Sequence, residues 1–283
     1  HTFVIYEGGA LPAKYAGKLF GVEPLQSQIV LSDVQRHGSS FKTNDITRPV
    51  TSDDKWFRPV DIKVVPDGAI YVADFFERYP SHREHYEGKV FRDDGRIYRL
   101  RAKGKPLQRP VNLGELTSEE LIEKLSDENK WVRRTALRLL GDQRAGTLVT
   151  KLQQLLHNDH GHASVEHLWA LNLDSGDLAP QILAAYLDHP QPDVRTWTVR
   201  LLCDERKVDS GTARRLAELA STEENIEVRT QLAGSARRLP TQQGLPIIRA
   251  LLQGEGDADD VYQPLLLWWA LEKHSTQSPA DVL

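Results

Sequence analysis

The sequence predicts a mixed fold with two domains, an incomplete β-propeller at 1–105 and an all-α solenoid at 117–283, joined by a linker at 106–116. Three observations lead to this prediction. Short apolar-polar alternations separated by Gly and Pro turns indicate strands in the first part. At Thr117 the apolar period changes from two to about 3.6 residues, which is typical of helices. From there on, a helix-turn-helix pattern returns about every 33 residues, as in α-solenoids.

The clearest strand signals lie between Trp56 and Arg101. Ile62 and Val64 alternate with polar neighbours, as expected for a half-buried strand. The run 66–68, Pro-Asp-Gly, then predicts a tight turn, because proline presets φ and glycine accepts a positive φ. A second strand follows, then a polar loop of roughly twenty residues and a third strand at 95–100. Short strands joined by tight turns are typical of one blade of a β-propeller.

Earlier strands are predicted at 1–6, 18–22 and 28–34, while the polar stretch 43–54 is predicted to be a loop. Together the strands make about two blades, whereas a closed propeller usually needs about four to eight. We therefore expect two sheets with at least one unpaired edge, in a piece of a longer protein. The complete lack of methionine and the start at His1 favour the same interpretation.

The repeat in the second part is marked by one valine per unit, in the series Val132, Val165, Val194, Val228 and Val261. The residues four and eight positions after each valine are mostly apolar, which places them on one stripe of a helix. Each valine follows an acidic or proline-rich turn, and each turn follows another amphipathic segment. Since one such unit cannot bury its apolar stripe alone, the units must stack. We expect all five valines to be buried near the starts of equivalent helices.

Two further features support the helical repeats. Thr117 and Glu120 have the spacing of a capping box, in which each side chain bonds to the other residue's backbone amide. Arg133, Arg195 and Arg229 follow three of the valines, and these Val-Arg pairs resemble HEAT repeats. We predict that the arginines form a ladder with the turn carboxylates of neighbouring units, rather than a ligand site.

Four polar residues are the candidates for chemistry in the first part: Arg58, Asp61, Asp74 and His82. Arg58 and Asp61 lie where one strand begins and Asp74 ends the strand that returns, so all three should lie at one end of the blade, where the loop with His82 departs. A guanidinium can bind a carboxylate or a quinone with two hydrogen bonds, and a carboxylate with an imidazole can move protons. The competing interpretation is structural: Arg58 and Asp61 brace the blade, and Asp74 accepts hydrogen bonds from loop amides.

A group of histidines lies in the second repeat, at His157, His160, His162 and His167. His162 and Glu166 are four residues apart and could share a helical face as metal ligands. However, this segment takes the place of the solvated turn that other repeats build from Asp, Pro and Asn, so no metal site is predicted. Cys203 lies among apolar neighbours and is predicted to be a buried, unreactive thiol.

Composition and missing motifs argue against several functions. The net charge of −4 offers no global attraction to nucleic acid. No apolar run reaches the roughly eighteen residues of a membrane-spanning helix. The absence of a CxxCH motif means that this chain cannot itself attach a c-type haem. The P-loop, GxGxxG, GxSxG and HExxH patterns are absent as well, which removes support for nucleotide, hydrolase and zincin functions.

Several stretches of the first part match a known pattern: YAGKLF at 15–20 with EP at 23–24, WFRPVD at 56–61, PDG at 66–68, YVAD at 71–74, His82 and GRIYR at 95–99. On these residues the chain resembles the large bacterial proteins known as putative membrane-bound dehydrogenases or PVC-type haem-binding proteins. Those proteins carry a propeller related to sugar dehydrogenases, then HEAT-like repeats, then a c-type cytochrome domain. The resemblance therefore implies β-propeller blades followed by a HEAT-like α-solenoid, with haem c confined to a separate domain outside this chain.

The same resemblance implies an exported oxidoreductase, periplasmic or at the cell surface, that acts on a sugar, a sugar derivative or an alcohol. His82 and Asp74 would be catalytic, and Arg58 and Asp61 would bind a cofactor, which in the complete propeller would be pyrroloquinoline quinone (PQQ) with calcium. The solenoid would dock a cytochrome c domain or protein. The alternative is a non-enzymatic scaffold, in which the propeller binds a carbohydrate or a protein and the solenoid assembles a complex.

Overall fold

The structure, a computed structural model, describes residues 2–78, 86–88, 93–104, 109, 111–144, 146–159, 161–254 and 257–282. The chain divides into two compact units, which are described separately. The first unit contains residues 1–35, 42–116 and 127–136, and the second contains 36–41, 117–126 and 137–283.

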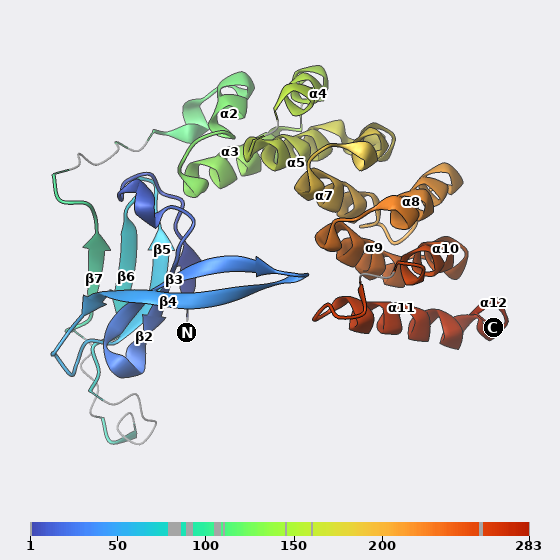
Figure 1. Ribbon diagram of the computed structural model, residues 1–283. Coiled ribbons are helices and arrows are strands. Elements are labelled where there is room, and N and C mark those ends of the chain that lie inside the picture. The colour runs from blue at the N-terminus through green and yellow to red at the C-terminus, as the bar shows by residue number, and fades with distance from the viewer. Residues whose placement is uncertain are drawn as a thin grey trace. The chain divides into compact units, whose positions relative to one another are not determined.

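Two antiparallel sheets make up most of the first unit (Figure 1). Four strands lie in the order β1-β2-β3-β4, and three lie in the order β5-β6-β7. The strands are β1 Phe3–Ile5, β2 Leu19–Glu23, β3 Gln28–His37, β4 Ser40–Thr51, β5 Pro59–Val64, β6 Ile70–Asp74 and β7 Arg96–Leu100. Short 3-10 turns at η1 Ala13–Tyr15 and η2 Pro24–Gln26 follow β1 and β2, and η3 Leu113–Glu115 lies beyond β7.

Apolar side chains from both sheets form one core, which consists of Tyr6, Leu11, Phe20, Val22, Ile29, Leu31, Ile62, Ile70 and Val72. The Tyr6 ring lies edge-on to Phe20, with 6.0 Å between the ring centroids. Its hydroxyl accepts a hydrogen bond from the Leu11 amide at 2.7 Å and donates one to the Gly68 carbonyl at 2.9 Å. The buried phenol is therefore satisfied, so it costs little to enclose it in an apolar core.

The predicted turn between β5 and β6 is present. The Gly68 amide donates to the Val65 carbonyl at 2.9 Å, and the Asp67 carboxylate accepts from the Ala69 amide at 2.9 Å. Gly68 has a φ of 76°, and a side chain there would collide with the carbonyl oxygen of Gly8. Glycine is therefore required at this position both by the backbone conformation and by the space available.

The prediction of a loop at 43–54 is wrong, because β4 runs from Ser40 to Thr51 beside β3. Nearly all residues of β4 are exposed, so no face of the strand needs an apolar alternation. The strand is formed by backbone hydrogen bonds to β3, and these leave no period-two signal in the side chains.

The predicted fold class, a mixed two-domain fold with β-sheets followed by HEAT-like helical repeats, is confirmed. Within the described residues the two sheets remain separate and do not close into a barrel, as expected. The second sheet has three strands there, rather than the four of a complete propeller blade, and the propeller itself is not shown.

Helices make up nearly all of the second unit (Figure 1). They are α2 Ser118–Lys124, α3 Lys130–Gln143, whose residues 130–136 belong to the first unit, α4 Val149–Asn158, α5 Ala163–Ser175, α6 Ala179–Leu183, α7 Pro192–Leu202, α8 Ser210–Thr222, α9 Ile226–Arg238, α10 Thr241–Leu252, α11 Gln263–Gln277 and α12 Pro279–Val282, with 3-10 turns η4 Gly176–Leu178 and η5 Ala184–Asp188. The predicted capping box is confirmed: the Glu120 amide donates to the Thr117 hydroxyl at 3.3 Å, and the Thr117 amide donates to the Glu120 carboxylate at 2.8 Å. Asp209 and Asn225 cap α8 and α9 in the same position.

The helices form two rows, with α5, α7, α9 and α11 in one row and α4, α8 and α10 in the other (Figure 1). The prediction that all five valines are buried is confirmed for two of them and is wrong for the other three. Val194 and Val228 are fully buried, Val132 and Val165 are half-buried, and Val261 is 52% exposed. Val261 precedes α11, whose first buried residue is Gln263. The last repeat therefore has a longer turn than the valine spacing assumes.

Candidate functional site

The turns between the helices are joined by arginines, as the sequence predicts. In α7, one terminal nitrogen of Arg195 donates to the carbonyls of His189 and Pro190, in its own turn, at 2.8 and 3.1 Å. Its Nε and other terminal nitrogen donate to the two carboxylate oxygens of Glu223, in the next turn, both at 2.7 Å. A guanidinium thus connects successive turns, with the two-pronged geometry that only arginine offers.

The next step of the ladder repeats this arrangement in a more buried setting. Arg229 in α9 donates backwards to the Glu223 carbonyl at 3.0 Å and forwards to Asp257 at 2.9 and 3.0 Å. It also donates to the carbonyl of Leu251 at 3.0 Å. A side chain at Gly254 would collide with the guanidinium, so glycine leaves the room that Arg229 occupies. The predicted ladder is confirmed at these two steps, and its role is structural.

The first arginine of the series ends the ladder differently. Arg133 is buried and donates to the Asp127 carbonyl of its own turn at 2.9 Å. Its forward partner is the carboxylate of Glu7, which also accepts from Lys130 at 2.8 Å. Burial would raise the pKa of Glu7, but its hydrogen bonds to Lys130 and Arg133 lower it below the usual value.

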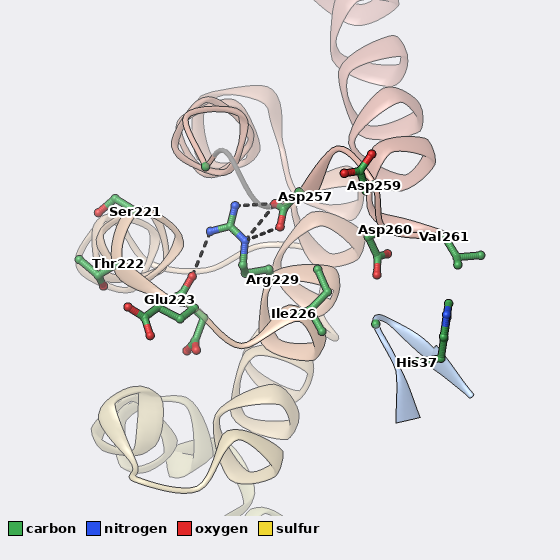
Figure 2. A pocket seen from close by; sticks show the side chains of 13 residues that line it. His37, Ser221, Thr222, Glu223, Ile226, Arg229, Asp257, Asp259, Asp260 and Val261 are labelled. Carbon is green, nitrogen blue, oxygen red and sulfur yellow. Dashed lines mark hydrogen bonds and ion pairs between the residues drawn. The ribbon is translucent and has the colours of Figure 1, made fainter. Parts of the chain in front are cut away.

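A cavity of about 710 Å³ lies within the second unit, between the turns that precede α9 and α11, and Arg229 is one of the residues that line it (Figure 2). We call it the turn groove. Figure 2 shows Arg229 between these two turns, with hydrogen bonds to both. The residues lining the turn groove include five carboxylates: Glu223, Glu224, Asp257, Asp259 and Asp260. Arg229 is the arginine in this lining, and it neutralises Asp257. The lining as a whole therefore keeps an excess of negative charge.

These carboxylates differ in how they are bound. Burial would raise the pKa of Glu223, but hydrogen bonds from Arg195 and from the Asn225 amide hold it below its usual value. Glu224 and Asp259 are exposed to solvent. The turn groove therefore combines carboxylates that stabilise the fold with others that face outwards, where a cationic group could reach them.

A polypeptide turn already contacts one wall of the turn groove, because residues 36–41 belong to the second unit. The Ser39 amide donates to the Asp260 carboxylate at 2.8 Å, and the Ser39 hydroxyl bonds to the other oxygen. Burial opposes ionisation of Asp260, but these bonds and two from its own turn lower its pKa far below the usual value. Arg36 forms ion pairs with Glu227 and, at 3.3 Å, with Asp193. The chemistry of this contact is therefore a cation and backbone amides on carboxylates.

Sequence reasoning did not identify the turn groove. The sequence predicts 257–259 only as an acidic turn between helices, and it gives no signal at Ser39. The available signal was the concentration of carboxylates in two consecutive turns, at 223–224 and 257–260. That signal is weak, because acidic turns are common at the surface of helical repeats.

In the first unit, the structure brings Arg58 and Asp74 together. The Arg58 amide donates to the Asp74 carboxylate at 2.8 Å, and the Phe76 amide donates to the same oxygen at 2.9 Å. The Arg58 guanidinium donates to the Ser27 hydroxyl at 2.6 Å and also to the carbonyls of Phe57 and Arg78. Both residues are buried, and the second oxygen of Asp74 has no hydrogen-bond partner among the residues that the structure describes.

Of the other two predicted residues, Asp61 is not part of this contact. Asp61 bonds to its neighbour Lys63 at 2.8 Å and to the Ile62 amide at 2.9 Å, and the hydrogen bond from Lys63 lowers its pKa. His82 lies outside the described residues, so its predicted place beside Asp74 stays a prediction. That Arg58 and Asp61 bind a cofactor also stays a prediction.

The described residues also contain no three His, Cys, Asp or Glu side chains grouped so that they could hold a metal ion. His167 is buried, which lowers its pKa although Asp159 lies 3.6 Å away. His160 lies outside the described residues. Cys203 is buried as predicted, and burial raises the pKa of its thiol to about 11. Such a thiol is a poor nucleophile at neutral pH.

Comparison with known families divides the chain at the same change of pattern. The family described as "Domain of unknown function (DUF7133)" matches residues 2–104, and the family of HEAT repeats matches residues 118–203. No curated protein and no solved structure gives a significant match. The HEAT match agrees with the helix pairs in this range. In the described part of the chain, no helix is both long and apolar enough to cross a membrane.

Proposed function

We propose that this protein is a scaffold whose HEAT-like solenoid binds a partner protein, and that the turn groove takes a basic segment of that partner. HEAT-like repeats support the first part, because stacked repeats present extended surfaces that usually bind proteins. The second part rests on one observation, the cavity of about 710 Å³ with five carboxylates in its lining.

The form of the turn groove suits a polypeptide. Its walls are two turns, so they offer carboxylates from loops that rigid helices hold in place. The contact between Ser39 and Asp260 illustrates how a wall carboxylate can bind a backbone amide. Glu224 and Asp259 are exposed and would attract a Lys or Arg side chain, mainly by speeding association at low salt. The predicted partner is therefore a flexible segment with spaced basic residues.

The experiment measures binding of a fluorescein-labelled synthetic peptide that copies residues 35–42, by anisotropy at several salt concentrations. We expect the protein to bind this basic peptide, and binding to weaken as salt rises, because exposed charges are screened. The double variant Glu224→Lys, Asp259→Lys should bind at least about tenfold more weakly, which corresponds to about 1.4 kcal/mol.

The matched control is the double variant Asp177→Lys, Glu205→Lys. It reverses the charge at two exposed residues of the solenoid that lie away from the turn groove. It changes the net charge by the same amount, so a purely long-range effect would weaken binding equally in both variants. Equal weakening, or binding of a peptide in which Arg36 and Lys42 are replaced by Glu as tightly as the original, would contradict the proposal.

A second candidate comes from the family resemblance, and the unpaired buried oxygen of Asp74 favours it. Under this proposal the chain is part of an exported oxidoreductase acting on a sugar or alcohol, with the solenoid docking a cytochrome. Asp74 and His82 would be its acid-base pair. Asp74→Asn and His82→Ala in a form that reduces a dye should each lower turnover by about 10²–10⁴-fold. Unchanged turnover in both variants would leave the scaffold proposal alone.

A further inference from the structure

The segment that connects β3 to β4 belongs to the second unit, at residues 36–41, and we call it the hairpin tip. Gly38 and Ser39 form its two-residue loop. Gly38 has a φ of 58°, which suits the first position of such a loop. A side chain at Gly38 would collide with the carboxylate of Asp260. The hairpin tip therefore has the shape that lets the turn before α11 lie directly against it.

The hairpin tip binds three carboxylates that occupy equivalent places in successive repeats. Asp193, Glu227 and Asp260 each stand one residue before the valine that marks their repeat, whereas the first two repeats carry no acid there. Arg36 forms ion pairs with Asp193 and Glu227. Ser39 binds Asp260 through its amide and its hydroxyl. The acids thus form a line along the repeats, and the hairpin tip contacts every member of that line.

The hairpin tip also occupies part of the turn groove. His37 and Gly38 are among the residues that line it, and Figure 2 shows His37 on the hairpin beside the turn that carries Asp260. Asp260 is the chain neighbour of Asp259, one of the exposed carboxylates that would attract a basic segment. A basic segment that binds this turn therefore meets the hairpin tip, which presents the same chemistry, a cation and a backbone amide.

Polar contacts alone hold the hairpin tip in place. None of its residues is buried, so it gains little from the hydrophobic effect. The side chains of Arg36 and Asp193 are 55% and 58% exposed, and ion pairs at exposed sites contribute little to stability. Such a contact can open and close, with a minor population of molecules in the open form.

We propose that the hairpin tip is an autoinhibitory segment, which occupies the carboxylates at the turn groove until a basic segment of the partner displaces it. This inference rests on the proposed function, because it names the regulation of that same groove. Each binding event must then open the hairpin tip. If about a tenth of the molecules are open, the apparent dissociation constant is about tenfold higher than that of the open groove.

The test measures anisotropy of the labelled peptide that copies residues 35–42, now with variants of the hairpin tip. The variant Arg36→Gln, Ser39→Pro removes the cation and the amide hydrogen that hold the tip. It should bind the peptide about tenfold more tightly than the unchanged chain. The matched control is Arg48→Gln, which removes the same charge from β4 outside the hairpin tip, where Arg48 pairs with Asp45 at 3.2 Å. Its affinity should equal that of the unchanged chain.

Hydrogen exchange of the Ser39 amide reports on the hairpin tip directly. This amide donates to Asp260, so its exchange should become faster when the peptide binds and displaces the tip. Exchange that becomes slower would make the hairpin tip a part of the binding site and overturn the autoinhibition.

The affinities separate this inference from the proposed function. Peptide binding that is equally tight in the unchanged chain and in Arg36→Gln, Ser39→Pro overturns the autoinhibition and leaves the turn groove as a binding site. An equal gain in Arg48→Gln overturns it too, because the gain would then follow from net charge. Failure of every chain to bind the peptide overturns the proposed function, and the autoinhibition with it.

Discussion

The helices α9 and α11 occupy equivalent places in one row, yet they begin differently. The first core residue of α9 is Val228, and Arg229 follows it and bonds to two turns. The first buried residue of α11 is Gln263, and Pro264 follows it. Proline suits the first turn of a helix, but it cannot donate to a next turn as Arg229 does. The arginine ladder therefore connects interior repeats and stops where α11 begins.

This difference shows that burial in the stack depends on neighbours more than on residue type. Val194 and Val228 lie in helices with a helix of the row on each side and are fully buried. Val261 has the same side chain and precedes the helix that is covered on one side. Identical residues at similar points of the repeat should thus respond very differently to the same substitution.

The largest effect should come from a charge placed in the interior of the stack. Val194→Asp puts a carboxylate in a fully buried, apolar place, where an unpaired charge is far more costly than in water. We expect a loss of more than about 4 kcal/mol in the free energy of unfolding, enough to unfold the solenoid. Circular dichroism during urea titration measures this loss.

The matched control for that substitution is Val261→Asp, because Val261 is 52% exposed. It should change the free energy of unfolding by less than about 0.5 kcal/mol. Similar losses in the two variants would mean that α11 is as deeply packed as α7, and the contrast between interior and terminal helices would be wrong.

A smaller loss should follow when one step of the ladder is removed. Arg229→Met leaves Asp257 buried without its partner, which typically costs about 3–5 kcal/mol. Arg138→Met is the control, since its partner Asp142 is 3.5 Å away and both side chains are well exposed. Exposed pairs contribute about 0–1 kcal/mol, so this variant should melt almost as the unchanged chain does. Equal melting shifts in the two variants would contradict a structural role for the ladder.

Most of the fold could be predicted from the sequence because it follows from periodic patterns. The change of period at Thr117, the capping box and the recurring Val-Arg pairs all have local physical causes, and the structure contains the corresponding helices and contacts. The exposed strand β4 was missed because it buries no face and so leaves no alternation in its residues. The shifted start of α11 was missed because Val261 fits the spacing while Gln263, a polar residue, takes the buried place.

The candidate site was much less predictable. Strand order suggested that Arg58, Asp61 and Asp74 would share one end of the sheet, and Arg58 and Asp74 do bond to one another. The direction of a side chain depends on its nearest partner, however, and Asp61 is held by the neighbouring Lys63. The turn groove depends on loops that are close in space but lie about 34 residues apart along the chain, one repeat length. Such a juxtaposition requires the stacking geometry, which periodicity alone does not supply.

The smallest of the three effects concerns pH and compares two neighbouring carboxylates, Glu223 and Glu224. The pKa of Glu223 in the fold is below its ordinary value of 4.5, because its bonds to Arg195 and the Asn225 amide outweigh its burial. A carboxylate with a lowered pKa stabilises the fold fully above its unfolded pKa, and this contribution is lost as the pH falls through the folded pKa.

The stability difference between the unchanged chain and Glu223→Gln should therefore be constant at neutral pH, at about 1.5–3 kcal/mol, and shrink steadily below pH 4.5. Glu224→Gln, at an exposed site, should leave the stability at neutral pH unchanged. Urea titrations from neutral pH to the acid limit give both curves. A Glu223→Gln difference that does not shrink in acid would show that the ion pair with Arg195 contributes nothing to the interior turns.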